Sequence, residues 1–99
     1  MNKNIIAEAR TWLGTAFCHQ GRVKISERSK GACDCLGLVI EVSRALGLTT
    51  KDGKAFYLQD HIDYHSIPDS KKLAETLDKC LTRVEVPQAG DLGLFSFLA

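Results

Sequence analysis

The sequence has no excess of charge of either sign. Its 13 lysines and arginines stand against 12 aspartates and glutamates, for a formal net charge of +1. A protein that binds nucleic acid or an anionic membrane through its charge needs a clear excess of basic residues, so neither partner is indicated. The hydrophobic share of 44% and the charged share of 25% are those of an ordinary globular protein.

A long apolar run is also missing. No stretch is long enough to cross a bilayer, and charged residues interrupt the first ten positions, where a secretory signal needs its apolar core. We therefore expect a chain that is made in the cytoplasm and has no membrane anchor. Without a secretory signal, the four cysteines are expected to be free thiols. No repeat, low-complexity segment or linker divides residues 1–99, so a single small domain is predicted.

The residues around Cys35 have the pattern of a reactive cysteine at the start of a helix. Asp34 carries the short side-chain oxygen of an N-cap, which puts Cys35 at the first helical position. The unpaired N–H groups and the macrodipole at that end favour a thiolate over a thiol. Apolar residues at helical spacing predict a helix that continues to Gly47, and Gly37 in its first turn predicts close packing against another backbone. A cysteine that only fills space is the alternative.

Two further helices are predicted from apolar spacing. The first begins at Asn2 or Asn4 and ends at Gly14, and the third begins at residue 69 or 70 and reaches about residue 82. The first helix is expected to bury one apolar stripe, formed by Ile5, Ile6, Ala9, Trp12 and Leu13.

The segments between and after the helices are predicted as follows. Asp52 and Gly53 favour a turn, and residues 55–68 have no clean period, which fits an irregular segment with at most a short helix. Residues 92–98 form an apolar run typical of a strand. Because a lone strand leaves its edge unpaired, we expect a further stretch of chain, a second copy or another protein to cover it.

Three separated segments together resemble the NlpC-type cell-wall peptidase family, in particular its phage tail-associated branch. They are Trp-x-Gly-Thr at residues 12–15, Asp-Cys-x-Gly-Leu-Val at residues 34–39 and Gly-Asp-Leu at residues 90–92. The resemblance implies an α+β fold of papain-like, NlpC type: three helices followed by the first strands of an incomplete antiparallel sheet. It also implies that residues 1–99 lack the C-terminal strands that would carry the catalytic histidine.

The resemblance implies a thiol peptidase chemistry that hydrolyses peptidoglycan stem peptides. Cys35 corresponds to the nucleophile and also supplies a backbone N–H to the oxyanion hole, while Asp34 caps its helix. Phe17 and Tyr64 are candidate binding residues, and no metal or other cofactor is implied. Phe17 stands where many members have a tyrosine. No residue matches the family's general-base histidine, so we expect the chain to be inactive or weak as it stands.

His19, His61 and His65 are the histidines that remain as substitutes for that base. A different reading of the chain is a phage-tail assembly or binding module that pairs with tail proteins, or with itself, through residues 92–98. The resemblance would also allow transport outside the cell in a virion.

A small zinc-binding protein is a further alternative. Its donors would come from Cys18, His19, Cys33 and Cys35 or from the two later histidines. The Cys-x-Cys spacing lacks the two-residue gap usual in structural zinc sites, and the same spacing argues against a thioredoxin-type redox pair.

Overall fold

The computed structural model describes residues 2–60 and 70–95 of the chain. Within them lie three α-helices, α1 (Asn2–Arg10), α2 (Cys35–Leu46) and α3 (Ser70–Cys80), and a short 3-10 helix, η1 (Phe56–Gln59). Two short strands, β1 (Arg22–Val23) and β2 (Ala32–Cys33), form a two-stranded antiparallel sheet. The predicted α+β class with three helices is therefore confirmed.

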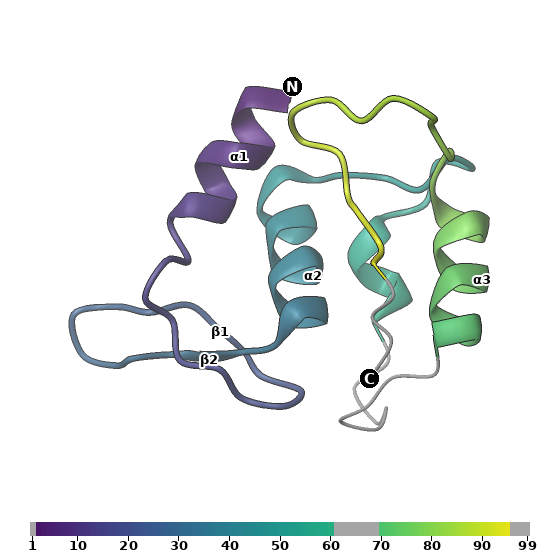
Figure 1. Ribbon diagram of the computed structural model, residues 1–99. Coiled ribbons are helices and arrows are strands. Elements are labelled where there is room, and N and C mark those ends of the chain that lie inside the picture. The colour runs from purple at the N-terminus through teal and green to yellow at the C-terminus, as the bar shows by residue number, and fades with distance from the viewer. Residues whose placement is uncertain (1, 61–69, 96–99) are drawn as a thin grey trace.

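Helix α2 lies at the centre of the arrangement. Figure 1 shows α1 on one side of it, η1 and α3 on the other, and the β1–β2 ribbon across the end at which α2 begins. A small apolar core joins α2, η1 and the end of α3 through the buried side chains of Ile40, Phe56 and Cys80. Because so few apolar side chains are buried, we expect the stability of the described part of the chain to be modest.

The sheet stands before α2 in the sequence, whereas strands were predicted after the third helix. Arg22 pairs with Cys33 and Val23 with Ala32, and Phe17 forms an isolated parallel bridge to Cys33 on the other side. Cys33 therefore lies between two neighbouring segments of backbone. These pairings fix the backbone directly before Cys35, and no strand is predicted from the sequence of residues 22–33.

The predicted strand at residues 92–98 is wrong for the part that the structure describes. Residues 91–95 have no strand pairing with any described segment, and residues 96–98 lie outside the described part. Leu92, Leu94 and Phe95 are exposed, and Phe95 retains 77% of its accessible surface. An apolar run becomes a strand only where a partner satisfies its backbone groups, and no described strand lies beside this one.

Helix α1 is shorter than predicted, and Asn2 and Asn4 lie within it rather than before it. After Arg10 the backbone tightens into a turn in which each N–H donates to the carbonyl three residues earlier, instead of four as in an α-helix. An example is the bond from the Trp12 N–H to the Ala9 carbonyl (3.1 Å). This change of period turns the following side chains relative to the helix. Trp12 is buried as predicted. Leu13 is 76% exposed, so the prediction that it belongs to the buried stripe is wrong.

The remaining local predictions are confirmed. Helix α2 ends at Gly47, whose φ of 63° is the left-handed conformation that glycine adopts readily. The turn at Asp52 and Gly53 forms, with the Gly53 N–H donating to the Thr50 carbonyl (2.9 Å). Helix α3 starts at residue 70 as expected and ends two residues before the predicted limit. The irregular segment contains η1 up to Gln59, and residues 61–68 of it lie outside the described part.

Candidate functional site

The site is built around Cys35, the first residue of α2. Asp34 is the N-cap: its backbone is extended, with φ −110° and ψ −174°, and its Oδ1 accepts a hydrogen bond from the Gly37 N–H at 2.7 Å. The Cys35 side chain is exposed, and all four cysteines are free thiols. The predicted cap and helix start are therefore confirmed, and they leave a solvent-accessible thiol at the positive end of a 12-residue helix.

Gly37 lets the first turn of α2 approach the preceding loop. A Cβ at this position would lie far inside van der Waals contact with the Gly21 carbonyl oxygen, and 2.9 Å from Nη1 of Arg22. Only a glycine fits here, as predicted from its place in the first turn. The start of the cysteine helix is consequently pressed against the segment formed by residues 19–22.

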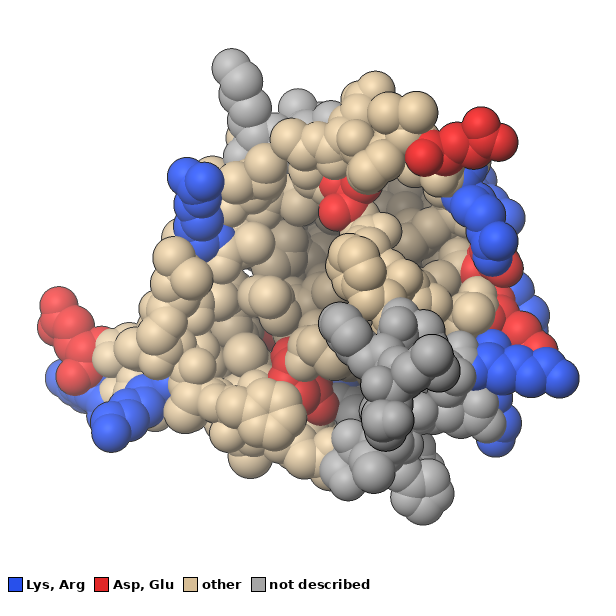
Figure 2. Space-filling view, in the orientation of Figure 1, with Lys and Arg blue, Asp and Glu red and all other residues tan. Residues whose placement is uncertain are grey.

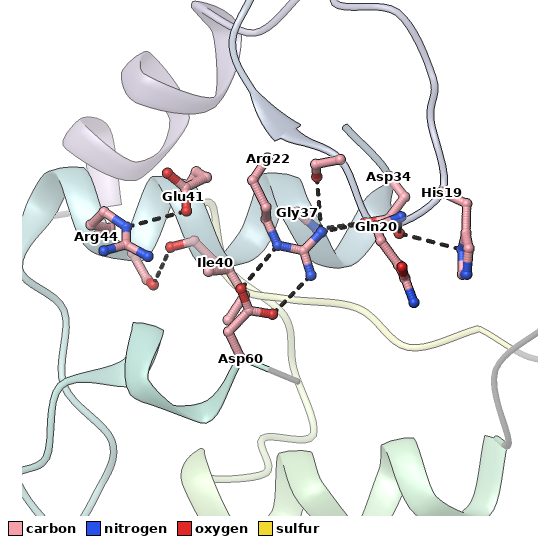
Figure 3. A network of polar contacts seen from close by, with 11 residues as sticks. His19, Gln20, Arg22, Asp34, Gly37, Ile40, Glu41, Arg44 and Asp60 are labelled. Atoms are coloured by element: carbon pink, nitrogen blue, oxygen red, sulfur yellow. Dashed lines mark hydrogen bonds and ion pairs between the residues drawn. The ribbon is translucent and has the colours of Figure 1, made fainter. Parts of the chain in front are cut away.

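Asp34 does more than cap the helix, since its carboxylate also holds that neighbouring segment. The side chain is only 6% exposed. Its Oδ2 accepts a hydrogen bond from the Gln20 N–H at 2.8 Å, and its Oδ1 lies 3.2 Å from Nη1 of Arg22. Figure 3 shows these partners converging on Asp34 from one side of the start of α2. The charge of this buried carboxylate is thus matched by a cation and by backbone donors.

His19 is the one histidine of the three that lies within the described residues. Its Nδ1 is 3.9 Å from Oδ2 of Asp34, and its side chain is 36% exposed. The structure thus brings this imidazole to the residue directly before Cys35. His61, His65 and the candidate binding residue Tyr64 lie outside the described part.

Phe17, the other candidate binding residue, is 82% exposed. Its backbone is fixed beside β2, because the Cys18 N–H donates to the Cys33 carbonyl at 3.0 Å and the Cys33 N–H donates to the Ala16 carbonyl at 2.9 Å. A large apolar side chain is thereby held in solvent on a defined backbone, two residues along the chain from His19. A binding role for Phe17 stays a prediction.

Cys33 differs from Cys35 in its surroundings. It is half-buried in the ribbon, and burial raises the pKa of its thiol. The negative charge of Asp34 raises that pKa further, while Arg22 partly offsets the effect. Cys33 is therefore a neutral thiol at neutral pH, and a neutral thiol is a poor nucleophile.

Three residues of this region were not identified from the sequence. Arg22 lies in a polar segment without a periodic pattern, yet its side chain is only 15% exposed and contacts both Asp34 and Asp60. Gln20 has a φ of 64°, a conformation uncommon for a residue other than glycine. Asp60 is 38 residues away from Arg22 in the chain, so no local pattern indicates their pairing.

Residues 2–60 and 70–95 contain no candidate metal site. No three cysteine, histidine, aspartate or glutamate side chains there are grouped so that they could hold a metal ion. The zinc alternative, as far as it used Cys18, His19, Cys33 and Cys35, therefore lacks a site. Among the described helices, none has the length and apolar character needed to cross a membrane.

Figure 2 shows that lysine and arginine side chains lie mainly at the periphery of one face, while its hollowed centre is surrounded mostly by uncharged residues, with acidic side chains above and below it. Comparison of the chain with protein-family models, with curated proteins and with solved structures gives no match.

Proposed function

We propose that the chain is an NlpC-type, papain-like domain whose chemistry is acyl transfer from a peptide carbonyl to the thiolate of Cys35. The substrate class is the stem peptide of peptidoglycan. One observation carries the proposal: Cys35 is an exposed thiol at the first position of α2, on a helix start that the buried Asp34 caps. A thiolate at that position is stabilised by the helix end and is open to a substrate.

The reaction would proceed in two steps. The thiolate attacks the amide carbonyl carbon, the C–N bond breaks, and the released amine takes up a proton as the thioester forms on Cys35. Water then attacks the thioester, which releases the carboxylic acid and restores the thiol. The backbone N–H of Cys35 has no partner within its own helix, since it belongs to the first turn, and is available to the oxyanion.

Proton delivery to the amine limits this chemistry. The nearest described imidazole, His19, faces Asp34, and no residue of the sequence matches the base of the resembled family. Loss of one member of a catalytic triad costs several orders of magnitude in rate. For residues 1–99 alone we therefore expect weak hydrolysis of amides, whereas a substrate whose leaving group needs no proton should still react at Cys35.

An activated ester tests the proposal separately from the proton transfer. The folded chain is incubated with a stem-peptide nitrophenyl ester and with the corresponding amide, and the acyl group is located by peptide mass analysis. The ester acylates Cys35, Cys35→Ala abolishes this adduct, and the matched variant Cys18→Ala retains it. Acylation spread equally over Cys18 and Cys35 would overturn the proposal.

A second function, an assembly module, is favoured by the apolar side chains exposed after α3. Leu92, Leu94 and Phe95 lie in a segment without regular structure. Such a segment supports pairing with a phage tail protein or with a second copy of this chain. Pairing with a second copy is tested by the mass of the chain in solution. Self-association is supported if the mass of the natural chain doubles with rising concentration while Phe95→Asp stays monomeric. It is contradicted if both chains stay monomeric.

A further inference from the structure

Arg22 connects three segments that are far apart in the sequence. Its Nη1 donates to the Gly21 carbonyl at 2.8 Å and to Oδ1 of Asp34 at 3.2 Å. Its Nε and Nη2 donate to the two carboxylate oxygens of Asp60 at 3.0 and 2.8 Å. In Figure 3 the guanidinium group lies between the two carboxylates, alongside the first turns of α2.

The pairing with Asp60 has the geometry that fixes a guanidinium group. Two parallel N–H donors meet two oxygens of one carboxylate, which sets the plane of the group as well as its distance. Arg22 and Asp60 are 15% and 17% exposed, so water screens the pair only in part. The remaining Nη1 is then directed at Asp34 and at the carbonyl that packs over Gly37.

Asp34 in turn controls the helix start at Cys35. Its Oδ1 accepts hydrogen bonds from both the Gly37 N–H and Nη1 of Arg22. The oxygen that caps the helix is therefore the same oxygen that binds the guanidinium group. Without Arg22, a buried negative charge directly before Cys35 would lose its nearest cation. A carboxylate beside a thiol that has lost its neighbouring cation disfavours the thiolate more strongly and weakens the reaction of the thiol with electrophiles.

We propose that Arg22 is the positioning residue of the Cys35 site, holding the Asp34 cap from one side while Asp60 fixes the guanidinium group from the other. The inference rests on the proposed role of Cys35 as nucleophile. Arg22 does not touch the substrate; it acts through Asp34 on the thiol. Asp60 thereby links the end of η1 to the start of α2.

The test is the rate at which iodoacetamide alkylates each cysteine at neutral pH, measured by peptide mass analysis on the folded chain. Arg22→Met slows Cys35 about threefold to tenfold and leaves the rate of the exposed Cys18 unchanged. Arg22→Lys restores the charge but not the two-pronged contact, so its Cys35 rate lies between those of Arg22→Met and the natural chain. The matched control is Arg83→Met, which removes an exposed arginine paired with Asp78 on α3.

The inference is overturned if folded Arg22→Met alkylates Cys35 at the natural rate, or if Cys18 and Cys35 slow by the same factor. Should Arg22→Met fail to fold by circular dichroism, Arg22→Lys and Asp60→Asn decide the question. At least a twofold loss at Cys35 with the rate of Cys18 unchanged supports the inference, and natural rates at Cys35 contradict it. The double variant Arg22→Lys/Asp60→Asn should lose less than the sum of the single losses, because both residues act through one contact.

Failure of this inference and failure of the proposed function are distinguishable. If the activated ester never acylates Cys35 but Arg22→Met still slows its alkylation selectively, the peptidase chemistry is rejected and the positioning role stands. If the ester acylates Cys35 equally in the natural chain and in Arg22→Met, the positioning role is rejected and the nucleophile stands.

Discussion

The backbone of Gly37 lies directly against the carbonyl oxygen of Gly21, with no room for a side chain between them. This contact joins the first turn of the cysteine helix to a loop 16 residues earlier in the chain. It holds the start of the cysteine helix against the segment that carries Arg22 and so contributes to the geometry of the candidate site.

Replacement of Gly37 by alanine should therefore destabilise the protein, although alanine is the better helix former. At an ordinary helical position the exchange would stabilise by about 1 kcal/mol. Here the added Cβ must displace the Gly21 carbonyl, and we expect a net loss of about 2 kcal/mol or more. Urea unfolding measures the difference. The control is Ala45→Gly at an exposed position of α2, which should cost about 1 kcal/mol from helix propensity alone. A stabilised Gly37→Ala variant would contradict the close packing.

Asp34→Ala should be among the most destabilising single changes. It removes the N-cap and leaves the partly buried Arg22 without one of its two carboxylates, for an expected loss of about 3 kcal/mol. Asp34→Asn keeps an oxygen for the Gly37 N–H and should lose less. Asp78→Ala, at an exposed ion pair on α3, should stay within about 0.5 kcal/mol of the natural chain. Equal losses for Asp34→Ala and Asp78→Ala in urea unfolding would rule out a structural role of the cap.

The ion pair of Glu8 with Lys24 should make a small contribution to stability that depends on pH. The hydrogen bond from Lys24 Nζ, 2.9 Å from Oε2, lowers the pKa of Glu8 below its ordinary value of 4.5. Since the folded state favours the charged carboxylate, its contribution is present above that value and is lost as the pH falls through the lowered pKa. Lys24 is 39% exposed, so solvent screening keeps the contribution under about 1 kcal/mol.

Glu8→Gln is the corresponding variant. Its free energy of unfolding should fall below that of the natural chain at neutral pH, and the difference should shrink at acid pH, as the pH falls through the lowered pKa and the carboxylate of the natural chain takes up a proton. Thermal or urea unfolding at both pH values measures the difference. A gap that widens on acidification would contradict the sign of the pKa shift.

Cys33 should react more slowly with alkylating agents than its neighbours Cys18 and Cys35. Burial raises the pKa of its thiol and the Asp34 charge adds to this effect, so less thiolate is present at neutral pH. Arg22 opposes the rise, and Arg22→Met should therefore slow Cys33 further. Peptide mass analysis after brief alkylation gives the order of reaction. Equal rates for Cys33 and Cys18 would show that burial in the ribbon has no effect on the thiol.

The parts of the fold that follow local rules could be predicted from the sequence. The cap at Asp34, the stop at Gly47 and the tight first turn at Gly37 each depend on a few consecutive residues. The pairing of Arg22 with Asp60 depends on two segments 38 residues apart, and no periodicity reports such a contact. For residues 92–95 the sequence predicted a strand that the structure does not contain, because their apolar pattern favours a strand but does not show whether a partner strand is present.

The residues of the candidate site likewise divide into those that a local sequence pattern predicts and those that only the folded chain reveals. Cys35 was identified because a cysteine after a capping residue has a chemical consequence at the helix end itself. His19 was one of three equivalent candidates until the structure placed its ring next to Asp34. Arg22 lies in a polar segment without a periodic pattern, and only the folded chain shows that its side chain is largely buried.

The most direct test of the account compares the alkylation rates of Cys35 and Cys18 in the folded chain and in urea. Both thiols are exposed, but only Cys35 begins a capped helix. We predict that Cys35 reacts about tenfold faster than Cys18 in the folded chain at neutral pH and that the two rates become equal when urea removes the helix. A ratio near one in the folded chain, or a ratio that urea leaves unchanged, would contradict an activated nucleophile at Cys35.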